Sequence, residues 1–138
     1  MQDDLKNVLF TREEINAKVA ELAARIDEDY EGKDVLLVGV LKGAIMVMAD
    51  LSRALKGHYT MDWMAVSSYG SGTKSSGVVR ILKDLDTDLT GRTVLIVEDI
   101  IDSGLTLAWL QPNLKSRRAE SVAICTLLRK PKAVQTDV

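Results

Sequence analysis

Two stretches of the chain are almost wholly apolar and rich in β-branched residues, at positions 34–41 (DVLLVGVL) and 93–100 (TVLIVEDI). A strand with one solvated face alternates apolar and polar residues, whereas an unbroken apolar run indicates a strand that is covered on both faces. Such strands are typical of parallel sheets, because the helices that connect parallel strands cover both sides of the sheet. This feature predicts an α/β fold.

The remaining segments fit that fold. Apolar residues at helical spacing predict helices at residues 11–30, 42–55 and 105–117. Further strands are predicted at residues 59–70, 78–85 and 120–130. We therefore expect a single domain over residues 1–138, with a Rossmann-like, mainly parallel sheet of about five strands. Pro112 lies inside the third helix, where a proline costs about 3 kcal/mol, so we expect a kink or a helix that restarts there.

The composition excludes several classes of protein. The net charge of -2 gives no electrostatic reason to expect nucleic acid or an anionic membrane as a partner. No apolar run approaches the roughly 20 residues of a membrane span, and the acidic start lacks the pattern of a signal peptide. His58 is the only histidine and Cys125 the only cysteine, which disfavours hydrolase triads, zinc sites and internal disulfides. We expect a cytoplasmic protein.

An acidic cluster follows the apolar run in residues 94–107 (VLIVEDIIDSGLTL). In parallel sheets, ligands bind beyond the carboxyl ends of the strands, which is where Glu98 and Asp99 are expected to lie. The small and hydroxyl residues that follow can present backbone N–H groups to a phosphate at the start of a helix. Carboxylates can accept hydrogen bonds from sugar hydroxyls, so a phosphorylated sugar would suit both parts. The plainer alternative is that Asp102 and Thr106 only cap a helix while the acids are solvated.

The segment 94–107 closely resembles the signature of type I phosphoribosyltransferases, which bind 5-phosphoribosyl 1-pyrophosphate, and in particular the hypoxanthine-guanine branch of that family. Residues 38–55 resemble the pyrophosphate-binding loop of the family and the helix after it, and residues 67–85 resemble its mobile catalytic loop. Residues 125–131 (CTLLRKP) resemble the segment that contacts the purine. The resemblance implies a type I phosphoribosyltransferase core with a partial hood.

The resemblance also implies roles for individual residues. Glu98 and Asp99 would bind the ribose hydroxyls, directly or through Mg²⁺, and Asp102 would be the general base that accepts the proton from purine N7. The 5-phosphate would be bound by a loop formed by Asp102, Ser103, Gly104, Leu105 and Thr106. Pyrophosphate would be held by Leu41, Lys42 and Gly43, with a cis peptide before the lysine. Ser68 and Tyr69 would close over the reacting centre, and Lys130 would contact the exocyclic oxygen of the purine.

The implied function is purine salvage. The enzyme would be a pentosyltransferase that moves the phosphoribosyl group to hypoxanthine or guanine, giving IMP or GMP and pyrophosphate, with Mg²⁺ as cofactor. Relatives carry an aromatic purine-stacking segment after the position of Val138, so we expect weak purine binding and low turnover. Family members self-associate, which implies a homodimer or homotetramer.

Two other functions are compatible with parts of the sequence. A non-catalytic regulatory module that binds 5-phosphoribosyl 1-pyrophosphate would have the same ligand site. A receiver-like signalling domain fits less well, because receivers carry their acidic pair after the first strand. Here that strand ends in Leu41, Lys42 and Gly43.

Overall fold

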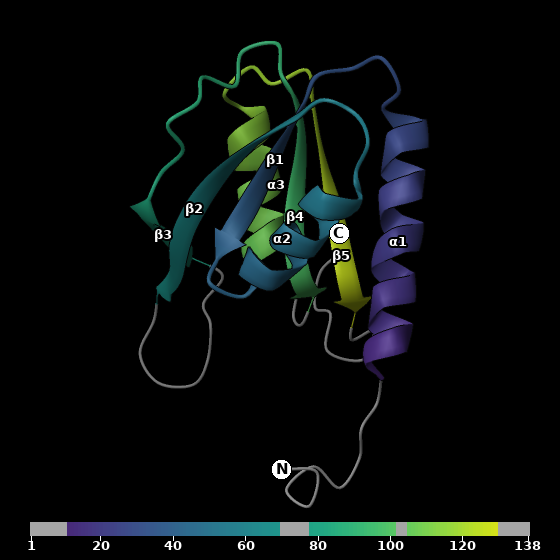
Figure 1. Ribbon diagram of the computed structural model, residues 1–138. Helices are drawn as coiled ribbons and strands as arrows, with labels where there is room; N and C mark the ends of the chain where they lie inside the picture. The colour runs from purple at the N-terminus through teal and green to yellow at the C-terminus, as the bar shows by residue number, and fades with distance from the viewer. Residues whose placement is uncertain (1–10, 70–77, 102–104, 130–138) are drawn as a thin grey trace, which may run out of the picture.

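The structure is a computed structural model that describes residues 11–69, 78–101 and 105–129 (Figure 1). Its elements follow one another along the chain as α1 (Arg12–Asp29), β1 (Val35–Leu41), α2 (Ala44–Ala54), β2 (Tyr59–Tyr69), β3 (Val78–Lys83), β4 (Thr93–Ile101), α3 (Leu105–Lys115) and β5 (Ser121–Arg129). The predicted helices and strands are all present. Most of their ends lie within two residues of the predicted positions.

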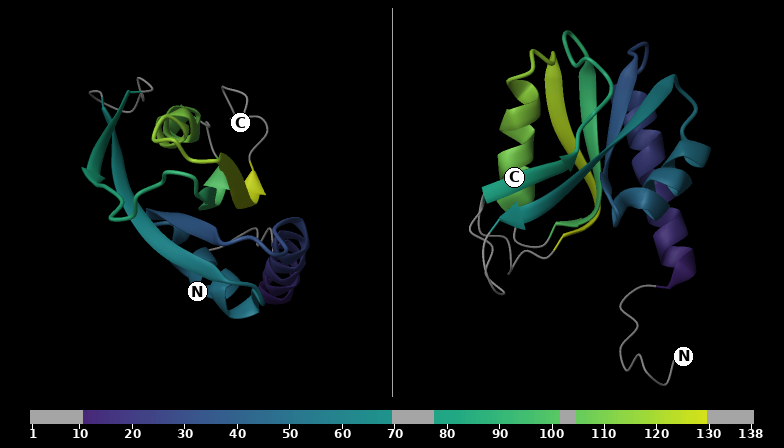
Figure 2. Two further views of the ribbon diagram at one scale, coloured as in Figure 1. Left: turned by 90° about the horizontal axis from the view of Figure 1, so that it is seen from above. Right: turned by 90° about the vertical axis from the view of Figure 1, so that its left-hand side faces the viewer.

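The five strands form one sheet in the order β3-β2-β1-β4-β5. β1 pairs in parallel with β2 and β4, and β4 pairs in parallel with β5, whereas β3 is antiparallel to β2. Helices α1 and α2 cover one face of the sheet and α3 covers the other (Figures 1 and 2). The predicted α/β fold with a mainly parallel sheet is confirmed.

The two faces of β1 and β4 carry separate halves of the core. Val38 and Ile96 belong to the cluster under α3, whereas Leu37 and Leu95 belong to the cluster under α1 and α2. All four side chains are buried. The period of two along each strand therefore supplies apolar residues to both layers, which is why β1 contains no polar residue and β4 contains none between Val94 and Val97.

The first helix begins as the sequence predicts. The Thr11 side chain accepts a hydrogen bond from the backbone N–H of Glu14, and the Glu14 carboxylate accepts one from the backbone N–H of Thr11. This capping box satisfies donors that the first turn leaves unpaired. None of the helices in the described ranges is long and apolar enough to cross a membrane.

Helix α3 runs through Pro112 as one helix, so of the two expected alternatives, a kink or a restart, the restart is wrong. A proline lacks the N–H group of one helical hydrogen bond, and the backbone is hydrogen-bonded again beyond it, since the N–H of Ser116 donates to the Pro112 carbonyl at 2.9 Å. Leu110 and Leu114 are fully buried on either side of the proline. Their packing under the sheet holds the helix together across this position.

Candidate active site

The carboxyl ends of β1 and β4 and the first turns of α2 and α3 lie at one edge of the sheet, at the bottom of Figure 1. β1 and β4 are neighbours, paired from Val35 opposite Thr93 to Gly39 opposite Val97. The segments that follow these paired residues are the ones singled out by the sequence as candidate binding loops. The fold therefore brings the predicted pyrophosphate loop beside the acidic pair.

The turn between β1 and α2 has a backbone that a ligand can approach closely. The peptide bond between Leu41 and Lys42 is cis, as the family resemblance implies. The Lys42 side chain is exposed, and Gly43 is the N-cap residue of α2. No side-chain hydrogen bond caps this helix start, and the N–H of Ile45 donates to the Lys42 carbonyl at 3.2 Å. The positive end of the helix dipole lies at this turn and favours an anion there.

Gly43 lies directly against the Asp99 carboxylate. A Cβ atom added at Gly43 would be 3.0 Å from both carboxylate oxygens of Asp99 and 3.1 Å from its Cγ atom. A side chain at this position would require the acid to move by a few tenths of an ångström. Glycine thus leaves room for the carboxylate to approach the backbone of the turn.

Glu98 and Asp99 form a coupled acidic pair at the end of β4. The backbone N–H of Asp99 donates to Oε1 of Glu98 at 3.2 Å. Burial, followed by a side-chain hydrogen bond with Asp99 and the charge of that residue, raises the pKa of Glu98 to about 8. In the absence of a cation, Glu98 is thus mostly protonated at neutral pH, which relieves the repulsion between two adjacent carboxylates.

This pair suits a magnesium ion that is shared with a phosphate-containing substrate. Mg²⁺ is commonly held by one or two carboxylates together with substrate phosphates and several waters. Among the residues that the structure describes, no group of three or more acidic, histidine or cysteine side chains surrounds a possible metal position. Two carboxylates beside the predicted pyrophosphate loop match a magnesium ion that is shared with substrate phosphates and waters. They do not match a metal site made only of protein ligands.

Other predicted site residues are described only in part. Asp102, Ser103, Gly104 and Lys130 lie outside the described residues. Thr106 is half-buried in the first turn of α3, which begins at Leu105. The backbone of Ser68 and Tyr69 ends β2, paired with Val79 and Val78 of β3.

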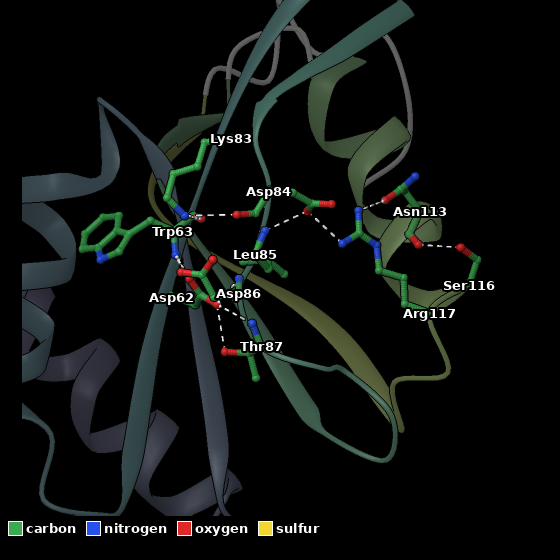
Figure 3. Close-up of polar contacts among 10 residues, drawn as sticks. All are labelled: Asp62, Trp63, Lys83, Asp84, Leu85, Asp86, Thr87, Asn113, Ser116 and Arg117. Atoms are coloured by element: carbon green, nitrogen blue, oxygen red, sulfur yellow. Dashed lines mark hydrogen bonds and ion pairs between the residues drawn. The ribbon is translucent and has the colours of Figure 1, made fainter.

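Sequence reasoning missed Asp62, a buried acid in the middle of β2. One carboxylate oxygen accepts hydrogen bonds from the N–H groups of Asp86 and Thr87 and from the Thr87 hydroxyl, at 2.8–3.0 Å (Figure 3). It organises the connection that follows β3. A signal was present in the sequence, since a charged residue between Met61 and Trp63 in a strand must find partners if it is buried.

The chain is similar to known proteins over almost its whole length. A family model described as phosphoribosyl transferase domain matches residues 9–137. A hypoxanthine-guanine phosphoribosyltransferase from Mycobacterium bovis is 57% identical over 141 residues, which cover 98% of this chain and 70% of that protein. A protein of the same name from Streptococcus thermophilus is 49% identical over 138 residues, covering 100% of this chain and 77% of the relative.

A solved structure is also very similar. The crystal structure of a hypoxanthine phosphoribosyltransferase from Staphylococcus aureus superposes with a TM-score of 0.96 at 44% sequence identity. The match covers 100% of this chain and 75% of that one.

Proposed function

The chain belongs to the phosphoribosyl transferase domain family, within its hypoxanthine-guanine phosphoribosyltransferase branch, and from this membership we propose that it transfers the 5-phosphoribosyl group of 5-phosphoribosyl 1-pyrophosphate to hypoxanthine or guanine. The products are IMP or GMP and pyrophosphate. The contact between Gly43 and Asp99 is the observation that carries the proposal, because it joins an anion-binding turn to carboxylates suited to a ribose.

Lys42 and Gly43 bind the pyrophosphate leaving group in this proposal. Breaking the bond at the anomeric carbon leaves negative charge on pyrophosphate, and preorganised positive groups at that position lower the barrier. The exposed Lys42 ammonium and the positive end of the α2 dipole supply such groups. Leu41 precedes them at the cis peptide.

Glu98 and Asp99 bind the ribose hydroxyls and are the residues that would hold Mg²⁺, directly or through water. The magnesium ion, when bound, neutralises part of the pyrophosphate charge. Asp99 lies between the turn and the ribose position, because its carboxylate rests on Gly43. It can therefore orient the sugar relative to the leaving group.

The remaining roles extend the proposal to the rest of the site. Asp102 is the general base for purine N7, and the 5-phosphate binds to Ser103, Gly104, Leu105 and Thr106 at the start of α3. A helix start is a favourable position for a dianionic phosphate. Lys130 contacts the purine, and Ser68 and Tyr69 come from the end of β2 to cover the reacting centre.

The direct test is pyrophosphate release from 5-phosphoribosyl 1-pyrophosphate, measured with hypoxanthine, guanine, xanthine or no base, each with and without Mg²⁺. We expect release that requires both Mg²⁺ and hypoxanthine or guanine. Tight binding of the sugar substrate by calorimetry without release in any mixture would favour the non-catalytic regulatory module instead.

The proposal also includes a homodimer or homotetramer in the cytoplasm. Ile45 and Met46, adjacent large apolar side chains in the first turn of α2, are 43% and 71% exposed, which makes this turn a candidate subunit contact. Sedimentation velocity over a range of concentrations tests the assembly. A monomer at every concentration would contradict it.

A further inference from the structure

The end of β2 leaves the main sheet. β2 pairs with β1 only as far as Ala65, which lies opposite Leu41. Beyond Ala65, β2 is paired with β3 alone. Residues 66–69 and 78–81 therefore form a two-stranded arm, which stands away from β1, β4 and β5 in Figure 2. An isolated two-stranded ribbon is only marginally stable, so the direction of this arm depends on what supports its base.

A β-bulge marks the point where the arm begins. Ala65 pairs with Lys83, whereas the next residue, Val66, pairs with Ile81. Leu82 is thus the extra residue on β3, and its side chain is 56% exposed. A bulge bends a strand and increases its twist, so this position sets the direction in which the arm leaves the sheet.

The Lys83 side chain forms hydrogen bonds that link β3 to β2 next to the bulge. Its Nζ atom donates to the carbonyl oxygen of Trp63 at 3.1 Å and to that of Asp84 at 3.0 Å (Figure 3). The paired residues of β2 and β3 end at Ala65 and Lys83, so β3 offers no further paired residue opposite Trp63. The Lys83 ammonium group instead donates the hydrogen bond to the Trp63 carbonyl, and this contact links β2 and β3 at the base of the arm.

The chain beyond Lys83 is firmly attached to the rest of the domain. Asp62 of β2 accepts hydrogen bonds from the N–H groups of Asp86 and Thr87, and Arg117, in the turn after α3, donates to the Asp84 carboxylate at 2.8 Å (Figure 3). In the arm itself, Val79 is buried, and Val66 and Ile81 are partly buried against the core under α3. Lys83 thus stands at the junction between the attached segment and the arm.

We propose that Lys83 is a positioning residue for phosphoribosyl transfer. By joining the Trp63 and Asp84 carbonyls beside the bulge, it sets the angle of the arm and hence the place of Ser68 and Tyr69 at its end. This inference rests on the proposed function for the roles of Ser68 and Tyr69. The position of the arm itself can be measured without any activity.

The first experiment measures the arm directly. Spin labels are placed on Arg80→Cys in the arm and Ala24→Cys on the outside of α1, both of which are exposed positions. The native Cys125 is buried, and burial raises its pKa, so it should take up little label. We expect Lys83→Met to broaden the distance distribution between the labels and Lys83→Arg to restore it. A label pair at Ala24→Cys and Glu120→Cys, away from the arm, should not change.

The second experiment measures turnover. We expect Lys83→Met to lower kcat by about 10- to 100-fold, the scale of a misplaced reacting group. The KM for 5-phosphoribosyl 1-pyrophosphate should stay within about twofold, because the binding turns are untouched. Lys83→Arg should recover most of the rate. Lys115→Met is the matched control, since the Lys115 ammonium also donates to a backbone carbonyl, that of Glu120 at 2.9 Å, but away from the arm.

The two proposals fail in different ways. A wild-type chain without transferase activity would overturn the proposed function. Unchanged label distances in Lys83→Met would overturn the role of Lys83 whatever the activity. Equal losses of kcat in Lys83→Met and Lys115→Met would also overturn it, because the effect would then be one of general stability.

Discussion

At the scale of single residues, Gly43 is the position where a small change is expected to affect ligand binding and leave the fold intact. In Gly43→Ala, the new Cβ atom would be 3.0 Å from both Asp99 carboxylate oxygens, so the acid must shift by a few tenths of an ångström. We expect the affinity for magnesium-bound 5-phosphoribosyl 1-pyrophosphate to fall about tenfold, equivalent to about 1.4 kcal/mol. Titration calorimetry measures this.

Gly57→Ala is the matched control for that variant. Its Cβ atom would also meet a neighbour at 3.0 Å, the Cε2 atom of Tyr59, but at the opposite edge of the sheet. Its affinity should equal that of the wild type. Equal affinities in Gly43→Ala and the wild type would remove Gly43 and Asp99 from the binding site.

Asp62 predicts a specific dependence of stability on pH. Burial alone would raise its pKa, but the hydrogen bonds from the Thr87 hydroxyl and from the N–H groups of Trp63, Thr87 and Asp86 lower it overall. A carboxyl with a lowered pKa in the folded state stabilises the fold above its unfolded pKa, near 4, and loses that contribution as the pH falls through the folded value.

We therefore expect Asp62→Asn to reduce the free energy of unfolding at pH 7 by about 1–3 kcal/mol, the range for hydrogen bonds to a charged group. The difference from the wild type should begin to shrink below about pH 4, where Asp62 becomes protonated in the unfolded chain, and should continue to shrink until the folded carboxyl is protonated as well. Urea unfolding at pH 7 and pH 3 tests this, with the exposed Asp34→Asn as control. A constant difference at both pH values would show that the charge of Asp62 is unimportant.

At the scale of the elements, β1 and β2 fit together through a glycine and a tryptophan. A Cβ atom at Gly39 would lie 2.5 and 2.6 Å from two ring carbons of Trp63, and 3.0 Å from the Cε atom of Met48. We expect Gly39→Ala to destabilise the domain by about 1–3 kcal/mol, the usual cost of overpacking. Thermal unfolding measures the effect, and adding Trp63→Leu should recover part of the loss. A Gly39→Ala variant as stable as the wild type would show that the indole moves freely.

The elements also show which structural features could be predicted from the sequence and which could not. The unbroken apolar runs predict β1 and β4 because local composition alone distinguishes a strand covered on both faces. Of the kink or restart expected at Pro112, the restart does not occur, since the packing of Leu110 and Leu114 under the sheet outweighs the local cost of the proline. The bulge opposite Ala65 was not predicted, because it depends on how two strands pair and not on either strand alone.

In the candidate site, too, some features were predicted from the sequence and others were not. Family resemblance predicts the cis peptide before Lys42, which the structure confirms. The packing of Asp99 against Gly43 joins two segments that are distant in the sequence, and the raised pKa of Glu98 comes from burial in the fold together with the adjacent Asp99. No spacing along the chain encodes these distances. The assignments to Asp102 and Lys130 remain predictions.

At the scale of the whole molecule, the proposed ligand would contact the ends of β1 and β4 and the start of α3, so it would link both halves of the core. A ligand that binds only the folded state raises the free energy of unfolding by about 2.7 kcal/mol at 100 times its dissociation constant. For a domain of this size, the melting temperature should then rise by on the order of 10 °C. We expect this shift with 5-phosphoribosyl 1-pyrophosphate and Mg²⁺ together, and a much smaller one with Mg²⁺ alone.

In Gly43→Ala, the same shift should need about tenfold more ligand, as the weaker affinity requires. If the melting temperature of the wild type does not change at any concentration of 5-phosphoribosyl 1-pyrophosphate with Mg²⁺, this result would contradict a binding site at this edge of the sheet.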